Sequence, residues 1–403
     1  MNVVICGAGI AGLTLAHRMS NQGWGVTVLE KASGPRTQGY MIDFFGPGYD
    51  AAEAMGLLPR LHELGYRVDE ARFVDARGRP RARLKFRQFA QSQDGRLLSI
   101  MRPDLELVLR ESLPEAVDLR FGTSPTTVET DPDGVRVTLS DGQRIGADLL
   151  VGADGIHSTV RSSVFARDRD VVRYLGFHTA AFTFSDPAVR ARVGDRFHLT
   201  DSVDRQMGLY GLRDGRVATY LVHRAADPTL PDDRRATLRA TYGSLGWVVP
   251  DALSRCPRDE EIYYDQIAQV EMPHWHYERV VLVGDACYAV SLIAGQGASL
   301  GVAGAFVLAE QLGHGPSVEE GLARYEELWR PVVEEKQQVA RQSVRWFLPR
   351  SRVQVWLRRV MLALARLPGF DRLVVGAIGG KHTTIVRELA HQSGRLRDTS
   401  TRR

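Results

Sequence analysis

The chain has 403 residues, 44% of them hydrophobic and 25% charged, with a formal net charge of +4 at pH 7. This composition is typical of a globular protein with one large or two ordinary domains. The small net charge gives no reason to expect a nucleic-acid partner. No run reaches the ~18 apolar residues of a membrane span, and the glycine-interrupted start lacks the basic leader of a signal peptide.

The three cysteines, Cys6, Cys256 and Cys287, have neither CxxC spacing nor a nearby set of histidines. Metal sites and disulfide frameworks are recognised by such spacing. We therefore expect no metal, no disulfide framework and a location in the reducing cytoplasm.

The first thirty residues predict a β-α-β unit. Residues 2–6 and 26–29 are short apolar runs, and residues 13–22 have apolar side chains at helical spacing. The sequence GAGIAG at residues 7–12 joins the first run to the helix. A glycine-rich turn in this position is typical of a dinucleotide-binding domain.

Each part of this turn has an expected role. Gly7 permits the tight turn, Gly9 lets a pyrophosphate approach, and Gly12 lets the helix pack on the strand. The N–H groups of Ile10 and Ala11 would then face the phosphates. A glycine-tight turn that binds no ligand is the alternative.

An acidic residue, Glu30, ends the second strand 18 residues beyond Gly12. Its carboxylate would accept hydrogen bonds from both ribose hydroxyls and would repel a 2′-phosphate. FAD or NAD therefore fits this unit better than NADP.

The following part of the chain mixes loop, helix and strand patterns. Residues 34–48 are rich in glycine and proline and predict a loop across the ligand, while residues 50–64 have a helical pattern. Residues 72–86 contain two strand-like stretches. Arg102 opens a helix whose first turn holds proline and aspartate. Short strands follow, and the last of them runs into Asp154 in the sequence GADGIHSTVR.

Strand-like stretches and polar turns dominate residues 173–270, which predicts a mostly antiparallel sheet. We expect substrate contacts from this sheet. Four residues on its strands are the candidates: Met207, Tyr210, Tyr220 and His223. Ordinary sheet packing or solvent exposure is the more frequent reason for such residues, because the faces of a strand alternate. No catalytic base is predicted.

Residues 281–301, VLVGDACYAVSLIAGQGASLG, hold the most informative pattern of the chain. An apolar strand stops at Asp285, which offers one carboxylate beside backbone that a ligand can approach. Gly295, Gln296 and Gly297 then open an apolar helix, whose free N–H groups and dipole suit negative charge. The carboxylate suits a hydroxyl group of a polyol or ribose, and the helix start suits an anionic ring or a phosphate.

The glycine turn and Glu30, with Arg102, Asp154 and Asp285 in this order, resemble the class A flavoprotein monooxygenases. This group includes para-hydroxybenzoate hydroxylase and the tetracycline-inactivating monooxygenases. The resemblance implies that Asp285 holds the ribityl chain of FAD and that Arg102 reaches the phosphate-ribityl region. It also implies that Asp154 belongs to a motif used in binding both FAD and NADPH.

Other parts of the flavin site also follow from the resemblance. The amides of residues 295–297 would face the pyrimidine side of the isoalloxazine. The loop from Gly39 to Asp43 resembles one that lies along the flavin ring, and Arg36 is a further candidate nearby.

The resemblance implies an FAD-dependent monooxygenase that uses NAD(P)H and O2 through a C4a-hydroperoxyflavin. The product would be a hydroxylated or oxygen-inserted aromatic or polyketide-like small molecule. No second glycine fingerprint suits a separate NADPH domain, because the glycines at residues 376–380 are wrongly placed. A flavin halogenase is disfavoured, since Trp275 stands alone in PHWHYE without the WxWxIP signature.

Four residues depart from the family pattern. Tyr288 stands where family members usually have histidine, Leu292 replaces a proline, Ser299 replaces an asparagine, and Gly304 falls near an expected aspartate. These departures keep two alternatives open: a reductase of the same fold acting on an unsaturated or isoprenoid substrate, and an FAD-binding protein without redox activity.

We therefore expect an α/β fold, in which a Rossmann-type FAD-binding domain is interrupted by a mostly antiparallel β substrate domain and followed by C-terminal helices. The expected boundaries are residues 1–172 for the first part of the FAD-binding domain (with inserted strands at about 71–100), 173–270 for the substrate domain, 271–345 for the second part, and 346–403 for C-terminal bridging helices and tail.

The C-terminal stretch WFLPRSRVQVWLRRVMLALARLPGF is apolar and basic with helical spacing. A helix that bridges the two domains, with arginines covering its outer face, is the favoured interpretation. Peripheral contact with a membrane surface is the alternative. The sequence predicts neither the substrate's identity nor the oligomeric state.

Overall fold

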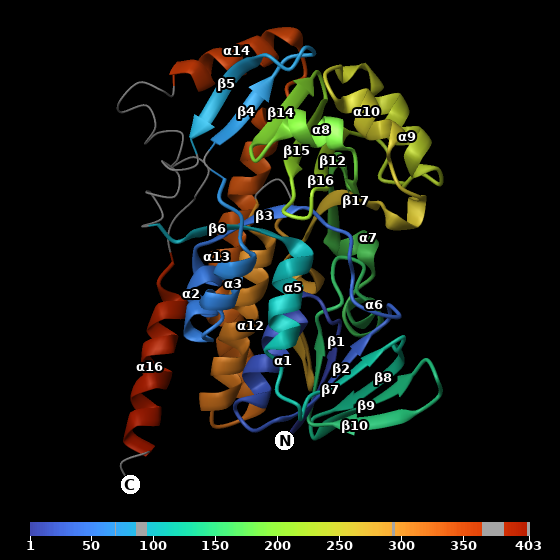
Figure 1. Cartoon of the computed structure of the whole chain (residues 1–403). Coiled ribbons are helices and arrows are strands. Elements are labelled where there is room, and N and C mark those ends of the chain that lie inside the picture. The colour runs from blue at the N-terminus through green and yellow to red at the C-terminus, as the bar shows by residue number, and fades with distance from the viewer. Residues whose placement is uncertain (69, 86–94, 292–294, 365–382, 401–403) are drawn as a thin grey trace.

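The computed structural model describes the chain except for residues 69, 86–94, 292–294, 365–382 and 401–403 (Figure 1). Two features named above lie outside the described residues. They are Leu292 and the glycines at residues 376–380, which do not fit a second glycine fingerprint.

A six-stranded sheet of order β18-β19-β11-β1-β2-β7 forms the core of the part that the sequence predicts to bind FAD. All of its strands are parallel except β18. Its central strands are buried on both faces, which explains why they read as continuous apolar runs. The strands are β1 Asn2–Cys6, β2 Gly25–Glu30, β7 Asp118–Phe121, β11 Leu149–Gly152, β18 His276–Tyr277 and β19 Val280–Leu282.

Different layers cover the two faces of this sheet. Helix α1 (Ile10–Ser20) packs on one face and contacts α12 (Gly297–His314) and α5 (Arg102–Glu111). A three-stranded meander contacts the other face (Figure 1). Its strands are β8 Pro125–Asp131, β9 Gly134–Leu139 and β10 Arg144–Ala147. Short helices at the edges are α6 Thr159–Val164, α7 Asp168–Val171 and α11 Asp285–Tyr288.

The helix expected over residues 50–64 is two helices, α2 (Pro47–Ala54) and α3 (Leu58–Leu64). The break contains Gly56, whose φ of 73° belongs to the left-handed region that glycine favours. The loop before α2 contains β3 (Met41–Phe45), which pairs with β6 (Leu97–Met101).

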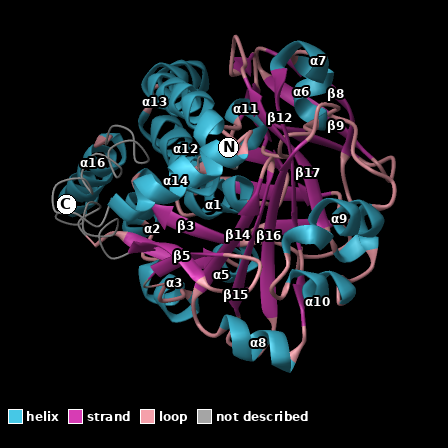
Figure 2. Cartoon of the chain, turned by 90° about the horizontal axis from the view of Figure 1, so that it is seen from above, coloured by secondary structure: helices cyan, strands magenta, loops and turns pink. Residues whose placement is uncertain are grey.

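The second sheet, which forms the core of the predicted substrate domain and is called the substrate sheet below, is eight-stranded and mostly antiparallel. Its order is β17-β12-β16-β15-β14-β4-β5, with β13 paired to β16. Figure 2 shows α9 and α10 on the side of this sheet away from α12 and α13. The strands are β4 Glu70–Val74, β5 Pro80–Lys85, β12 Val172–Ala181, β13 Thr183–Phe184, β14 Phe197–Ser202, β15 Arg205–Gly211, β16 Val217–Arg224 and β17 Tyr263–Val270. The helices are α8 Pro187–Val193, α9 Arg234–Tyr242, η1 Gly243–Leu245, α10 Val249–Ser254 and η2 Asp259–Glu261.

The expected placement of the inserted strands needs a correction. Strands β4 and β5 do not extend the FAD-binding sheet but the substrate sheet, because β4 pairs in parallel with β14. The reason is a small apolar cluster in which Ala71, Phe73 and Ala82 pack against Leu199 of β14. The substrate sheet is therefore assembled from two distant parts of the chain.

The helices described in the C-terminal part are α13 (Val318–Phe347), α14 (Arg352–Leu364) and α16 (Ile385–Ser400). Helix α13 packs along α12, α14 packs on β5, and α16 lies against α2 and α12 (Figure 1). Among the residues described, no helix is both long and apolar enough to cross a membrane. The expected fold class is confirmed.

Helix α14 differs from the expectation in the direction of its side chains. Arg358 and Arg359 pair with the buried Asp201 of β14 instead of covering the outer face. The exposed face instead carries a stripe of apolar side chains at helical spacing. Its members are Val353, Trp356, Leu357 and Met361.

Candidate flavin site and substrate cavity

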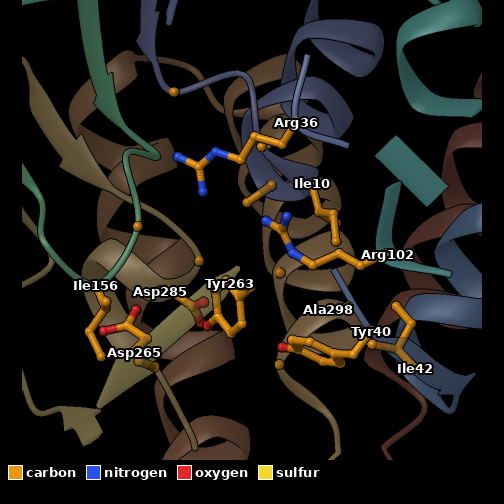
Figure 3. Close-up of a pocket in the computed structure, with 18 of the residues that line it drawn as sticks. Ile10, Arg36, Tyr40, Ile42, Arg102, Ile156, Tyr263, Asp265, Asp285 and Ala298 are labelled. Carbon is orange, nitrogen blue, oxygen red and sulfur yellow. The ribbon is translucent and has the colours of Figure 1, made fainter. Parts of the chain in front are cut away.

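A cavity of about 540 Å³ lies where the carboxyl ends of β1, β11 and β19 face the substrate sheet. Figure 3 shows side chains from both domains pointing into it. Twelve of the fifteen predicted cofactor residues line the cavity: Gly7, Gly9, Ile10, Ala11, Glu30, Arg36, Asp43, Arg102, Asp154, Asp285, Gly295 and Gly297. The remaining three, Gly12, Gly39 and Gln296, do not line it, although each adjoins a lining residue in the chain.

The glycine turn has the geometry that a close ligand requires. Gly7 has a φ of 109°, and a Cβ there would lie 2.4 Å from the carbonyl oxygen of Ala153. A Cβ on Gly12 would lie 1.9 Å from the carbonyl oxygen of Gly7, so this glycine lets α1 pack on β1. In contrast, a Cβ on Gly9 would meet nothing within 4 Å, which leaves the cavity side of the turn open. These three positions fit a pyrophosphate cradle.

Two backbone amides hold the Glu30 carboxylate at the edge of the cavity. Its Oε2 accepts from Ala8 N–H at 2.9 Å, and its Oε1 accepts from Ala32 N–H at 3.0 Å. The carboxylate is therefore fixed in orientation, with lone pairs left for ligand hydroxyls.

The Asp285 carboxylate is held differently. Within the described chain no side chain or amide donates a hydrogen bond to it, and it lines the cavity at the start of α11. Burial raises the pKa of Asp285, and the guanidinium of Arg102 acts against this rise. The place of this carboxylate in the cavity therefore fits a ligand that brings hydroxyl groups.

Arg102 opens α5, and its Nη2 lies 2.9 Å from Oε1 of Glu106 in an ion pair one turn along the helix. Burial lowers the pKa of Arg102, but the charges of Glu106 and Asp285 outweigh burial, and the net shift is upward. Arg36 reaches the same cavity from the loop after β2, as Figure 3 shows. Two guanidinium groups therefore face the region expected for phosphates.

The carboxylate of Asp154 holds the start of α6. It accepts hydrogen bonds from Thr159 N–H at 2.7 Å, from Val160 N–H at 3.2 Å and from the Ser158 hydroxyl. This is the turn-capping role that such a residue has without any ligand. Asp154 lines the cavity, but its oxygens already have protein partners.

Helix α12 begins at the cavity, where Gly295 has a φ of 64° and Gly297 and Ala298 line the wall. The first-turn N–H groups of this 18-residue helix lack intrahelical partners. Gln296 is buried at the N-cap, and its carbonyl accepts from Leu300 N–H at 2.9 Å. Gly39, in turn, packs against Pro103 at the start of α5.

The opposite wall is aromatic, and much of it was not predicted. Tyr40 lies between Tyr220 and Tyr263, with ring centroids 5.9 and 5.6 Å apart. Tyr210 accepts a hydrogen bond from Met41 N–H through its hydroxyl, which ties β15 to β3. The missed lining residues include Tyr40, Thr179, Phe197, Gln206, Tyr263 and Asp265. Their only sequence signal was a place on a predicted loop or strand.

Two substrate candidates do not line the cavity. Met207 is fully buried in the cluster beneath α9 and α10, and Nδ1 of His223 lies 3.0 Å from the Tyr242 hydroxyl of α9. The reason is strand alternation: Met207 and Tyr210 are three residues apart on one strand, as are Tyr220 and His223 on the next. Within each pair only the tyrosine faces the cavity.

Two of the departures from the family pattern, Tyr288 and Gly304, contact each other. A Cβ on Gly304 would lie 2.0 Å from the Tyr288 hydroxyl, so the tyrosine occupies the space that glycine leaves. Tyr288 also packs on Trp275 with ring centroids 4.9 Å apart. Ser299 accepts from Gly48 N–H at 2.9 Å and donates to the carbonyl of Phe45. Tyr288 and Gly304 therefore fit each other closely, while Ser299 ties α12 to β3 and the start of α2.

The sequence from residue 1 to residue 342 matches the FAD binding domain family. The chain belongs to this family of flavoprotein monooxygenases. It is 34% identical over 354 residues to an uncharacterized protein of Mycobacterium tuberculosis (strain ATCC 25618 / H37Rv), covering 83% of this chain and 91% of the relative. It is 28% identical over 345 residues to a flavin-dependent monooxygenase from an unknown prokaryotic organism, covering 84% and 87%.

Solved structures agree with this assignment. The tetracycline destructase Tet(51) superposes with a TM-score of 0.79 at 25% identity, covering 95% of this chain and 99% of that one. HpxO of Klebsiella pneumoniae, solved with FAD and uric acid, has a TM-score of 0.77 at 21% identity and covers 94% and 95%, which shows the fold alone. The chain is an FAD-dependent monooxygenase, and the predicted class A resemblance is confirmed.

Proposed function

We propose that this monooxygenase uses NAD(P)H and O2 to hydroxylate, or insert oxygen into, an aromatic or polyketide-like small molecule. One observation carries the proposal: the glycine turn, Asp285 and the tyrosines of the substrate sheet line one continuous cavity. A cofactor held at one end would thus face a substrate held at the other.

The cofactor end offers donors and acceptors in the order of an extended dinucleotide. The turn at Gly7–Gly9 suits the pyrophosphate, Glu30 the ribose of the adenosine half, and Arg36 and Arg102 the phosphate charges. Asp285 suits the ribityl hydroxyls, and the N-terminus of α12 suits the electron-rich edge of the flavin ring. Bound here, FAD would supply the redox chemistry of oxygen activation.

The substrate end would contribute steric complementarity to the substrate and the exclusion of water. Tyr40, Tyr220 and Tyr263 present flat apolar faces that suit a ring, and their clustered packing limits water near the reacting atoms. Gln206 and Asp265 are the polar groups that could orient a substrate from the sheet. We assign no catalytic base.

The test is a screen of aromatic and polycyclic compounds with the FAD-loaded protein. We expect a substrate to stimulate NAD(P)H oxidation and O2 uptake together, and to yield a product that carries one atom from ¹⁸O2. Stimulated NAD(P)H oxidation without O2 uptake would replace the proposal with a reductase. A product without the label would refute the oxygenation.

A further inference from the structure

A second cavity, of about 310 Å³, lies at the boundary between the two domains. Its walls come from the connection between α3 and β4, from α8 and the start of β14, and from the end of β15. It shares four lining residues with the flavin cavity: Met41, Val68, Phe197 and Tyr210. The second cavity is therefore an antechamber that these side chains separate from the flavin cavity.

The antechamber is unusually rich in arginine. Arg67, Arg190, Arg196 and Arg213 line it, whereas Asp195 is the one acidic residue among its described lining residues. Arginine is suited to planar oxyanions because its guanidinium donates several hydrogen bonds in a fixed fork.

The guanidinium group of Arg190 is closely packed in the wall of the antechamber. Its Nη2 lies 2.6 Å from Oδ1 of Asp195, but its Nε is buried and has no hydrogen-bond partner in the described structure. A Cβ on Gly211 would lie 2.5 Å from Cζ of Arg190, so the group rests on bare backbone. This leaves a buried donor beside the cavity without an acceptor.

The groups that accept hydrogen bonds from Arg213 are neutral backbone carbonyls. Its Nη1 donates to the Glu63 carbonyl at 2.9 Å, its Nη2 donates to the Gly65 carbonyl, and the guanidinium stacks 4.4 Å over the Tyr66 ring. The carboxylates of Asp104 and Asp214 act on the same region at longer range.

The other two arginines are also weakly neutralised. The Nε of Arg196 lies 3.7 Å from Glu70, a carboxylate that is also paired with Arg72. Arg67 is exposed and makes no ion pair with any described residue. The described lining of the antechamber thus carries four arginines against one acidic residue, while Glu70 and Asp104 act on these arginines from outside the lining.

We propose that the antechamber binds an oxyanion, a carboxylate or phosphate, of a ligand whose planar part reaches past Tyr210 and Phe197 into the flavin cavity. The planar part's role rests on the proposed function, whereas oxyanion binding does not. The oxyanion has two sources, an acidic aromatic substrate or the phosphates of the nicotinamide co-substrate.

Isothermal titration of the FAD-loaded protein with 2-naphthoate and its neutral isostere 2-naphthamide tests the site. We expect naphthoate to bind about tenfold more tightly, the ratio for one charge-assisted hydrogen bond. Arg190→Met should remove this preference and leave naphthamide binding unchanged. Arg67→Gln, which removes a side chain without an ion pair, should weaken naphthoate in the same direction if Arg190→Met does not fold.

Arg192→Met is the matched control, because Arg192 is on the same helix, is half exposed and lies outside the antechamber lining. It should leave both affinities unchanged. Equal binding of naphthoate and naphthamide, together with ADP binding that Arg190→Met does not change, would overturn the proposal. ADP binding that depends on Arg190 would instead support the site and assign it to the co-substrate.

The binding measurement separates this proposal from the proposed function. It needs no turnover, and the visible absorbance of the same sample reports its FAD occupancy. A failed oxygenation test with an intact naphthoate preference would remove the reaction and leave the oxyanion site standing.

Discussion

The carboxylates around the flavin cavity differ in how many partners the protein supplies. Glu30 accepts from two backbone amides, and Asp154 accepts from the start of α6. Asp285 has no donor within the described chain. The free energy that each residue contributes to FAD binding should follow this difference, because Asp285 gains its first donors from the ligand, whereas Glu30 and Asp154 already have protein donors.

We expect Asp285→Ala to weaken FAD binding more than Glu30→Ala. Hydrogen bonds to a charged group contribute about 1.5–3 kcal/mol, so the loss of FAD affinity on Asp285→Ala should be about tenfold or more. Titration of apoprotein with FAD, followed by flavin fluorescence, measures both. Glu129→Ala, which removes one partner of an exposed ion pair, is the control. Full FAD occupancy of Asp285→Ala would refute the ribityl assignment.

Among the cavity carboxylates, Asp43 should make the stability of the protein depend most strongly on pH. Burial raises its pKa to about 6, against the hydrogen bond that the Ser99 hydroxyl donates to Oδ1 at 2.6 Å. Because the folded pKa is above the unfolded value, the protonated form is favoured in the fold. Its stabilising contribution is complete below the unfolded pKa and is lost as the pH rises through about 6.

Asp43→Asn should therefore change the pH dependence of unfolding. The amide keeps an acceptor for Ser99 but does not titrate, so the variant should gain stability over wild type between pH 4 and pH 7, by on the order of 1 kcal/mol. Urea unfolding of the apoprotein across this range measures the difference. Parallel curves for the two proteins would show that Asp43 ionises freely.

At the scale of elements, α12 combines two functions. Its N-terminus faces the cavity, while its middle turn is packed against Tyr288 and Trp329 at Gly304. The pairing of Tyr288 with Gly304 explains how the chain can lack two residues usual in the family and keep a close-packed core. These departures give no support to an FAD-binding protein without redox activity.

We expect Gly304→Ala to destabilise the protein by about 1–3 kcal/mol through overpacking, although alanine favours helix. Tyr288→Phe in the same chain should recover part of the loss, because the Tyr288 hydroxyl is the nearest atom. Gly301→Ala on the same helix is the control, since its Cβ would lie 3.7 Å from the nearest atom, in ordinary contact. Urea unfolding measures all three, and equal stability of both alanine variants would contradict the packing account.

The parts of the structure that were predictable are those with a local cause. The turn at residues 7–12, Glu30 and the strand ending at Asp285 were predictable, because a tight turn or a strand end is decided by neighbouring residues. The pairing of β4 with β14, and the contact of Tyr40 with Tyr263, join distant segments. No short pattern encodes such pairs. Met207 and His223 do not line the cavity, because they lie on the opposite strand faces from Tyr210 and Tyr220.

At the scale of the whole molecule, the interface between the two sheets creates both cavities. One sheet supplies the strand ends, and the other supplies tyrosines on its facing side. The linking elements are α13 and α14, which run from the FAD-binding core toward the substrate sheet (Figure 1). Any relative movement of the sheets would change the aromatic wall and the antechamber together.

The strand order β19-β11-β1 determines when the parts of the cofactor site become available during synthesis on the ribosome. The first strand emerges early, but its two neighbours follow only after long intervening segments. At about 10 residues per second, roughly half a minute separates β1 from β19. A nascent chain therefore holds the glycine turn long before it can hold Asp285 beside it, so cofactor insertion must come late in synthesis or after release.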